Sequence, residues 1–111
     1  MTSPDLKICI NIAAIVCSQD GLISMSEEDH MHEILCTRFN NLARQDFDKL
    51  IEEFFDSAPM LEECCALVED PELKTFIVGL CEKSASSDGL DIRENIALQR
   101  LLSIWRAKTD G

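Results

Sequence analysis

The segment CSQDGLISMSEED, residues Cys17 to Asp29, decides how this chain folds. It lies between two stretches whose apolar residues recur at the spacing of an α-helix. Gly21 suits the left-handed conformation that ends many helices, and Ser24 and Glu27 have the spacing of a capping box that begins one. The segment therefore predicts a helix, a tight turn and a second helix.

A second segment, SASSDGLDIRE at residues 84–94, has the same layout. Each copy begins with a capped proline start, SPDL at Ser3 and DPEL at Asp70, and each Asp-Gly is followed by a capping box, Ser24-x-x-Glu27 or Asp91-x-x-Glu94. The first cap and the second cap are 21 positions apart in both copies, although the second Asp-Gly is displaced by one residue. This agreement indicates a duplicated helix–turn–helix unit.

The 3.6-residue apolar period continues along the whole chain and strand-like alternation is absent, which predicts an all-α fold. We expect a compact bundle of about six helices, built from two pseudo-symmetric helix–turn–helix repeats in a single domain over residues 1–111. The repeat halves cover roughly residues 3–40 and 70–108, and residues 41–69 supply connecting helices. The first helix, about residues 4–19, is apolar on nearly every side and should be central. The final residues, AKTDG, are expected to be frayed.

The composition narrows the classes of function. With 10 Lys and Arg against 21 Asp and Glu, the net charge is −11, which disfavours nucleic-acid binding and suits cations or a basic protein surface as partners. The longest apolar run is too short to span a bilayer, so no membrane insertion is expected. The six cysteines form no C-x-x-C pair, and without a signal peptide they are interpreted as reduced thiols of a cytoplasmic protein.

Two kinds of site fail on the residues themselves. An EF-hand would place Val16 at the first loop position, where a carboxylate is needed, and Ser18 at the third. In the second copy, Asp91 and Asn95 fall where Ile and Glu belong. A nucleophilic enzyme would need a base beside a Cys, Ser or Lys, and no such pair is recognisable, so the chain is predicted not to be an enzyme. His30 and His32 point to different sides of their helix and are poor candidates for a shared ligand role.

The two turns are similar to those of the TerB-like family, tellurite-resistance-type helical domains whose halves each carry an Asp-Gly turn followed by a cap and a Glu. The resemblance covers most of the chain in layout and is specific at SQDGLISMSEE and SASSDGLDIRENIALQRLL. It implies a cytoplasmic, acidic helical module of a stress-response system that binds a divalent cation through acids near the turns. The matching acids are Asp20, Glu27, Asp88 and Glu94, with Asp91 where the family more often has a hydroxyl cap.

Oxygen ligands of this kind favour Ca²⁺ or Mg²⁺ as the cation. The alternative that stays open is a metal-free interaction or inhibitor protein, whose acidic surface docks a basic protein partner. A metal-assisted enzyme ranks below both, because the sequence offers no dedicated general base. Capping alone also explains Glu27 and Glu94, but it does not require an aspartate before each glycine.

Overall fold

The computed structural model describes residues 4–19, 21–86 and 92–110, with the side chains of 107–110 left aside. In this part of the chain all regular structure is helical, which confirms the predicted all-α bundle of about six helices. The six helices are α1 (Pro4–Cys17), α2 (Met25–Arg38), α3 (Arg44–Ser57), α4 (Leu61–Ala66), α5 (Pro71–Ala85) and α6 (Ile92–Asp110).

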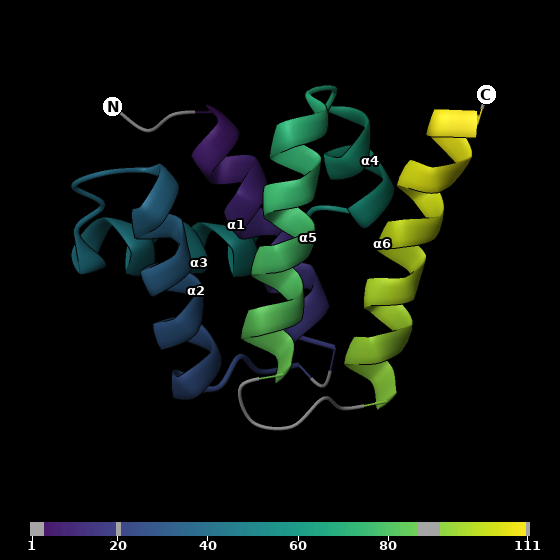
Figure 1. The fold of residues 1–111 in the computed structure, drawn as a ribbon. Coiled ribbons are helices and arrows are strands. Elements are labelled where there is room, and N and C mark those ends of the chain that lie inside the picture. The colour runs from purple at the N-terminus through teal and green to yellow at the C-terminus, as the bar shows by residue number, and fades with distance from the viewer. Residues whose placement is uncertain (1–3, 20, 87–91, 111) are drawn as a thin grey trace.

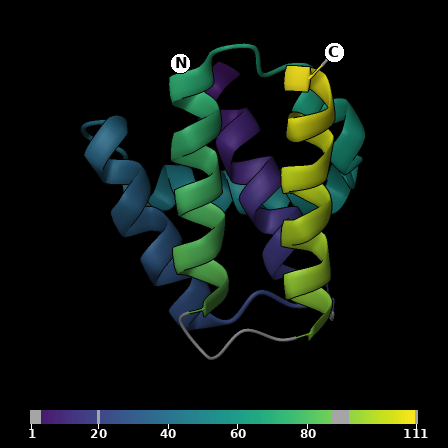
Figure 2. The same cartoon turned by 45° about the vertical axis from the view of Figure 1, so that its right-hand side comes forward.

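Helix α1 is the central element, as its apolar sequence predicts. It packs against each of the other five helices, and Figures 1 and 2 show it behind α5 and between the outer helices. Eight of its fourteen residues are buried, around most of its circumference. The buried residues of all six helices form one hydrophobic core around it.

The two capped helix pairs, α1–α2 and α5–α6, correspond in burial as well as in sequence. Residues 67 positions apart are buried in both copies at the pairs Leu6 and Leu73, Ile10 and Ile77, Cys17 and Ser84, Glu27 and Glu94, and Met31 and Leu98. Helix α5 lies between α2 and α6 in both views, and α1 and α2 each pack closely on it. The last turns of α1 and α5 and the first turns of α2 and α6 therefore lie at one end of the bundle (Figures 1 and 2).

The connecting helices close the other sides of the core. Helix α3 is amphipathic and buries Phe47, Leu50, Ile51 and Phe54, and it packs on α1. It ends at Ala58, whose φ of 44° is left-handed, directly before Pro59. Helix α4 lies against α1 and α6.

Two predicted boundaries differ from the structure. Helix α1 ends at Cys17 rather than near residue 19, because a tight turn begins at Ser18. In this turn the Gly21 N–H donates to the Ser18 carbonyl (2.8 Å), and Gly21 has φ +94°. The expectation of a frayed tail was wrong, since α6 continues through Asp110. Within the described ranges, no helix has the length and apolarity needed to cross a bilayer.

Candidate functional site: a buried thiol between two glutamates

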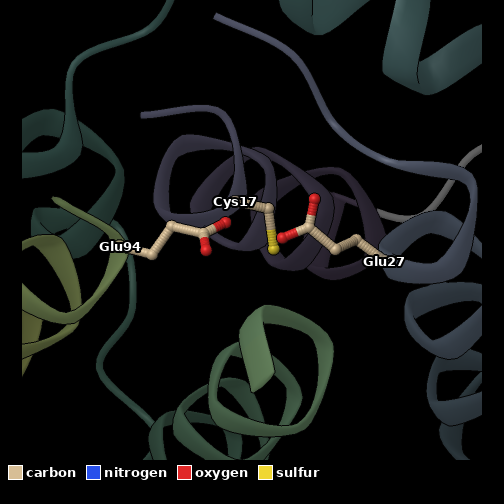
Figure 3. Close-up of side chains that lie close together, drawn as sticks. All are labelled: Cys17, Glu27 and Glu94. Atoms are coloured by element: carbon tan, nitrogen blue, oxygen red, sulfur yellow. The ribbon is translucent and has the colours of Figure 1, made fainter. Parts of the chain in front are cut away.

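Three side chains from three helices meet at the turn-bearing end of the bundle. Cys17 Sγ and one carboxylate oxygen each of Glu27 and Glu94 all lie within 4.8 Å of one another. Figure 3 shows the two carboxylates reaching toward each other from opposite sides, with the thiol between them. The exposed fractions are 0% for Cys17, 5% for Glu27 and 8% for Glu94, so the cluster is buried.

Glu27 is held by the capping box that the sequence predicts. The Glu27 N–H donates to Ser24 Oγ (3.1 Å), and the Ser24 N–H donates back to Glu27 Oε1 (2.8 Å). The second of these hydrogen bonds holds the carboxylate against the first turn of α2, where the positive end of the helix dipole stabilises negative charge. The local sequence thus sets the position of Glu27 before any tertiary contact is considered.

Glu94 has the corresponding position in the second copy. It is the third residue of α6, as Glu27 is the third residue of α2, and it is nearly as deeply buried. The dipole of α6 favours its negative charge in the same way. Two equivalent first-turn glutamates are therefore brought face to face by the packing of the two repeats.

Cys17 supplies the third member of the cluster from the last position of α1. Burial raises the pKa of the Cys17 thiol above its usual range, and the nearby Glu27 carboxylate raises it further. The thiol is consequently protonated at neutral pH and behaves as a weak donor facing two acceptors. Sequence reasoning took Cys17 as a core residue and missed it. The sequence signal that could have identified it is its correspondence with Ser84, which lies 67 positions later. Ser84 is a second small polar side chain, fully buried at the end of α5.

The other predicted site residues, Asp20, Asp88 and Asp91, lie outside the described residues. Of the five candidates, the structure brings Glu27 and Glu94 together.

The remaining acids at the start of α2 have a structural partner. Arg44, the first residue of α3, ion-pairs with Asp29 (2.7 Å), Asp48 (3.0 Å) and Glu28 (3.5 Å). One guanidinium thus ties the first turns of α2 to α3. Desolvation raises the pKa of Glu28 despite the opposing effect of Arg44. These partly exposed ion pairs account for much of the acid density beside the first turn without any ligand.

A Cys–His contact on α2 was not anticipated, but its geometry does not make a nucleophilic pair. His32 Nε2 lies 3.7 Å from Cys36 Sγ and 2.9 Å from the Leu42 carbonyl. Because a carbonyl oxygen only accepts, Nε2 must carry the proton and donate it to Leu42, which leaves it unable to deprotonate the thiol. His30 instead contacts the Ser26 carbonyl (2.8 Å), so the two histidines have separate partners.

The cluster has a definite electrostatic character. Two buried carboxylates at this separation repel each other unless a positive charge or a shared proton lies between them. In the described part of the chain Glu27 has no ion pair with a Lys or Arg. The arrangement is therefore suited to attract a cation.

No protein-family model matches the chain, and neither the curated proteins nor the solved structures include a detectable match.

Proposed function

We propose that this protein is a non-enzymatic binding module that holds a hard divalent cation, Ca²⁺ or Mg²⁺, between the first turns of α2 and α6. The observation that carries the proposal is the convergence of the Glu27 and Glu94 carboxylates within 4.8 Å at a buried position. A cation there neutralises both charges at once. Buried charges in proteins are normally paired or bound to metal, and a cation supplies the positive partner that Glu27 does not have among the described residues.

The spacing is compatible with a calcium ion. Two oxygen ligands on opposite sides of Ca²⁺, each at about 2.4 Å, are about 4.8 Å apart. Mg²⁺ requires about 2.1 Å and near-octahedral geometry, so it needs a smaller separation and more water ligands. Two carboxylates are few ligands for one ion. We therefore expect weak binding by these two side chains alone, with a dissociation constant of about 10⁻⁴ to 10⁻³ M, as in the weaker calcium-binding modules.

The protonated thiol argues against zinc. Zn²⁺ binds cysteine as thiolate, and burial together with the neighbouring carboxylate disfavours that form of Cys17 by raising its pKa. Oxygen ligands then remain the principal donors, and these favour Ca²⁺ or Mg²⁺. The TerB-like resemblance of the two turns implies a divalent cation, and on that resemblance we extend the proposal to a role in a cytoplasmic stress-response system.

The test is a melting experiment on the full chain after removal of bound metal, with and without millimolar Ca²⁺ or Mg²⁺. An ion that binds only the folded state with a dissociation constant of about 10⁻⁴ to 10⁻³ M adds about 1.4–2.7 kcal/mol at about 10 mM, which raises the melting temperature. The double variant Glu27→Gln with Glu94→Gln should lose this gain while keeping the capping box of α2, since Gln also completes a capping box. Glu33→Gln, an exposed position on the same helix, is the matched control and should keep the gain.

An unchanged melting temperature for the wild-type protein at millimolar cation would refute the proposal. So would a gain that persists in the double glutamine variant, because the ion would then bind elsewhere. Isothermal calorimetry with the same ions supplies the stoichiometry, and one ion per chain is expected.

A metal-free interaction module is the second candidate, and one observation favours it. Four apolar side chains near the same end of the bundle are unusually exposed: Leu22 at 74%, Met25 at 69%, Ile92 at 78% and Ile96 at 61%. Exposed apolar residues beside an acidic region are typical of surfaces that contact a protein. This candidate predicts no response to either cation, so the melting experiment separates the two.

A further inference from the structure

A groove lies between α5 and α6, at the end of the bundle opposite the glutamate cluster. It has a volume of about 500 Å³, and its lining includes Lys74 and Val78 of α5 with Leu102, Trp105 and Arg106 of α6. Helix α5 begins, and α6 ends, at this end of the bundle (Figures 1 and 2). A volume of this size lies within the usual range for small-molecule pockets, about 300–1,000 Å³.

The floor of the groove is apolar. Trp105 is 5% exposed, and its indole N–H donates to the Cys65 carbonyl of α4 (3.3 Å). Because the polar atom of the ring is engaged inside the protein, the indole offers the groove carbon surface. Val78 and Leu102 are half-buried and add aliphatic surface beside it.

The charges of the groove are opposite to those of the protein as a whole. Acidic residues outnumber basic ones 21 to 10 in the chain, yet both charged residues in the lining, Lys74 and Arg106, are basic. Lys74 Nζ lies 6.0 Å from the centre of the Trp105 ring, so its charge is held close to the apolar floor. A ligand that complements this groove has an apolar body and one negative charge.

We propose that this groove binds an amphipathic carboxylate, a medium-chain aliphatic acid, with its chain on Trp105, Val78 and Leu102 and its carboxylate toward Lys74 and Arg106. An acidic peptide would share the charge, but a cavity of about 500 Å³ accommodates a small molecule rather than a helix. The site uses none of the residues of the glutamate cluster, and its occupancy does not depend on the proposed cation.

The chain contains its own reporter for this site. Trp105 is the single tryptophan, and there is no tyrosine, so selectively excited fluorescence comes from the groove alone. Titrating the full chain with decanoate should give a saturable change in Trp105 emission. Octanoate should bind more weakly by about fourfold for each methylene it lacks, as expected when the chain is buried. Decanol and decyltrimethylammonium, which have the same chain without the negative charge, should bind more weakly than decanoate.

Two variants and a matched control test the charge requirement. Lys74→Gln and Arg106→Gln should each weaken decanoate binding about two- to fivefold, the effect of losing one partly exposed ion pair. Lys49→Gln removes the same charge from an exposed position on α3 and should leave binding unchanged. Circular dichroism checks that each variant retains the helical fold, as expected for positions that are not buried.

The proposal is overturned by several results. These are the absence of a saturable change with decanoate, equal binding of decyltrimethylammonium, and a Lys49→Gln effect as large as that of Lys74→Gln. Binding of a synthetic acidic amphipathic peptide in the absence of any decanoate binding would also overturn it, because the occupant would then be a protein segment.

Discussion

Replacing Glu27 and Glu94 by glutamine, singly and together, measures the interaction between the two buried carboxylates. Glutamine keeps the shape and the hydrogen-bond acceptor and removes the charge, so the first turn of α2 retains its capping box. Two unit charges 4.8 Å apart, the limit that the structure sets, repel by about 3.5 kcal/mol at an effective dielectric constant of about 20. Each glutamine also loses a favourable helix-dipole interaction of about 0.3–1 kcal/mol.

In metal-free buffer at neutral pH, Glu27→Gln should therefore be more stable than the wild type by about 2–3 kcal/mol. The double variant should gain nothing further, because the first substitution already removes the repulsion. The coupling energy of the double-mutant cycle is expected to be about 3 kcal/mol. Urea denaturation followed by circular dichroism measures the four free energies of unfolding, with the slope checked for a common unfolded state.

Ca²⁺ at about 10 mM should remove much of this difference, because it stabilises the wild type by about 1.4–2.7 kcal/mol and leaves the double variant unchanged. Two results would refute the reasoning. Additive energies within about 0.5 kcal/mol in metal-free buffer would mean that the two carboxylates do not interact as charges. Glutamine variants less stable than the wild type without metal would mean that a positive charge of the protein or a shared proton already neutralises the pair.

Three further predictions concern the reactivity of the thiols, the ionisation of Cys9 and two glycines. A thiol reagent should modify Cys36 in the folded protein and the five buried cysteines only after denaturation. Burial raises the pKa of Cys9 from 9.0 to about 12, so the folded state retains a proton that the unfolded state releases, and the free energy of unfolding should fall between about pH 9 and pH 12. Cys9→Ala should flatten this fall, and an equal pH dependence in both proteins would contradict it. Gly21→Ala should destabilise the folded protein by about 1 kcal/mol or more, because Gly21 has φ +94°. Gly79→Ala should stabilise it slightly, because Gly79 lies within α5 and has room for a methyl group. Equal urea midpoints for the two variants would contradict this prediction.

Local signals in the sequence account for most of the fold. Pro4, Met25 and Pro71 begin helices where the caps predict, and Ser24 with Glu27 forms the predicted capping box. Such signals act within one turn of chain, so they survive any tertiary arrangement. The central place of α1 was also predictable, because a helix that is apolar on all sides must be surrounded.

The site was predictable only in part. Both glutamates were found as caps, but their meeting depends on how two repeats pack, which no spacing along the chain encodes. Cys17 could not be told from an apolar core residue at the end of a helix, because a free cysteine is often buried and packs as a small hydrophobic side chain. The ion pairs of Arg44 with Glu28 and Asp29 were also missed, because they depend on tertiary packing between residues 16 and 15 positions apart.

The duplication explains how a cap becomes a candidate site. In one isolated repeat, the third residue of the second helix would face water, and a glutamate there would serve only the capping box. When the two repeats pack, the same residue of each copy is enclosed and meets its equivalent beside Cys17, at exposed fractions of 5% and 8%. Capping therefore accounts for the presence of each glutamate, but it gives no benefit from placing two negative charges together. Placing the two carboxylates together costs electrostatic free energy unless a positive charge lies between them. For this reason, the double-mutant cycle with and without metal tests the proposed function more directly than removal of either carboxylate alone.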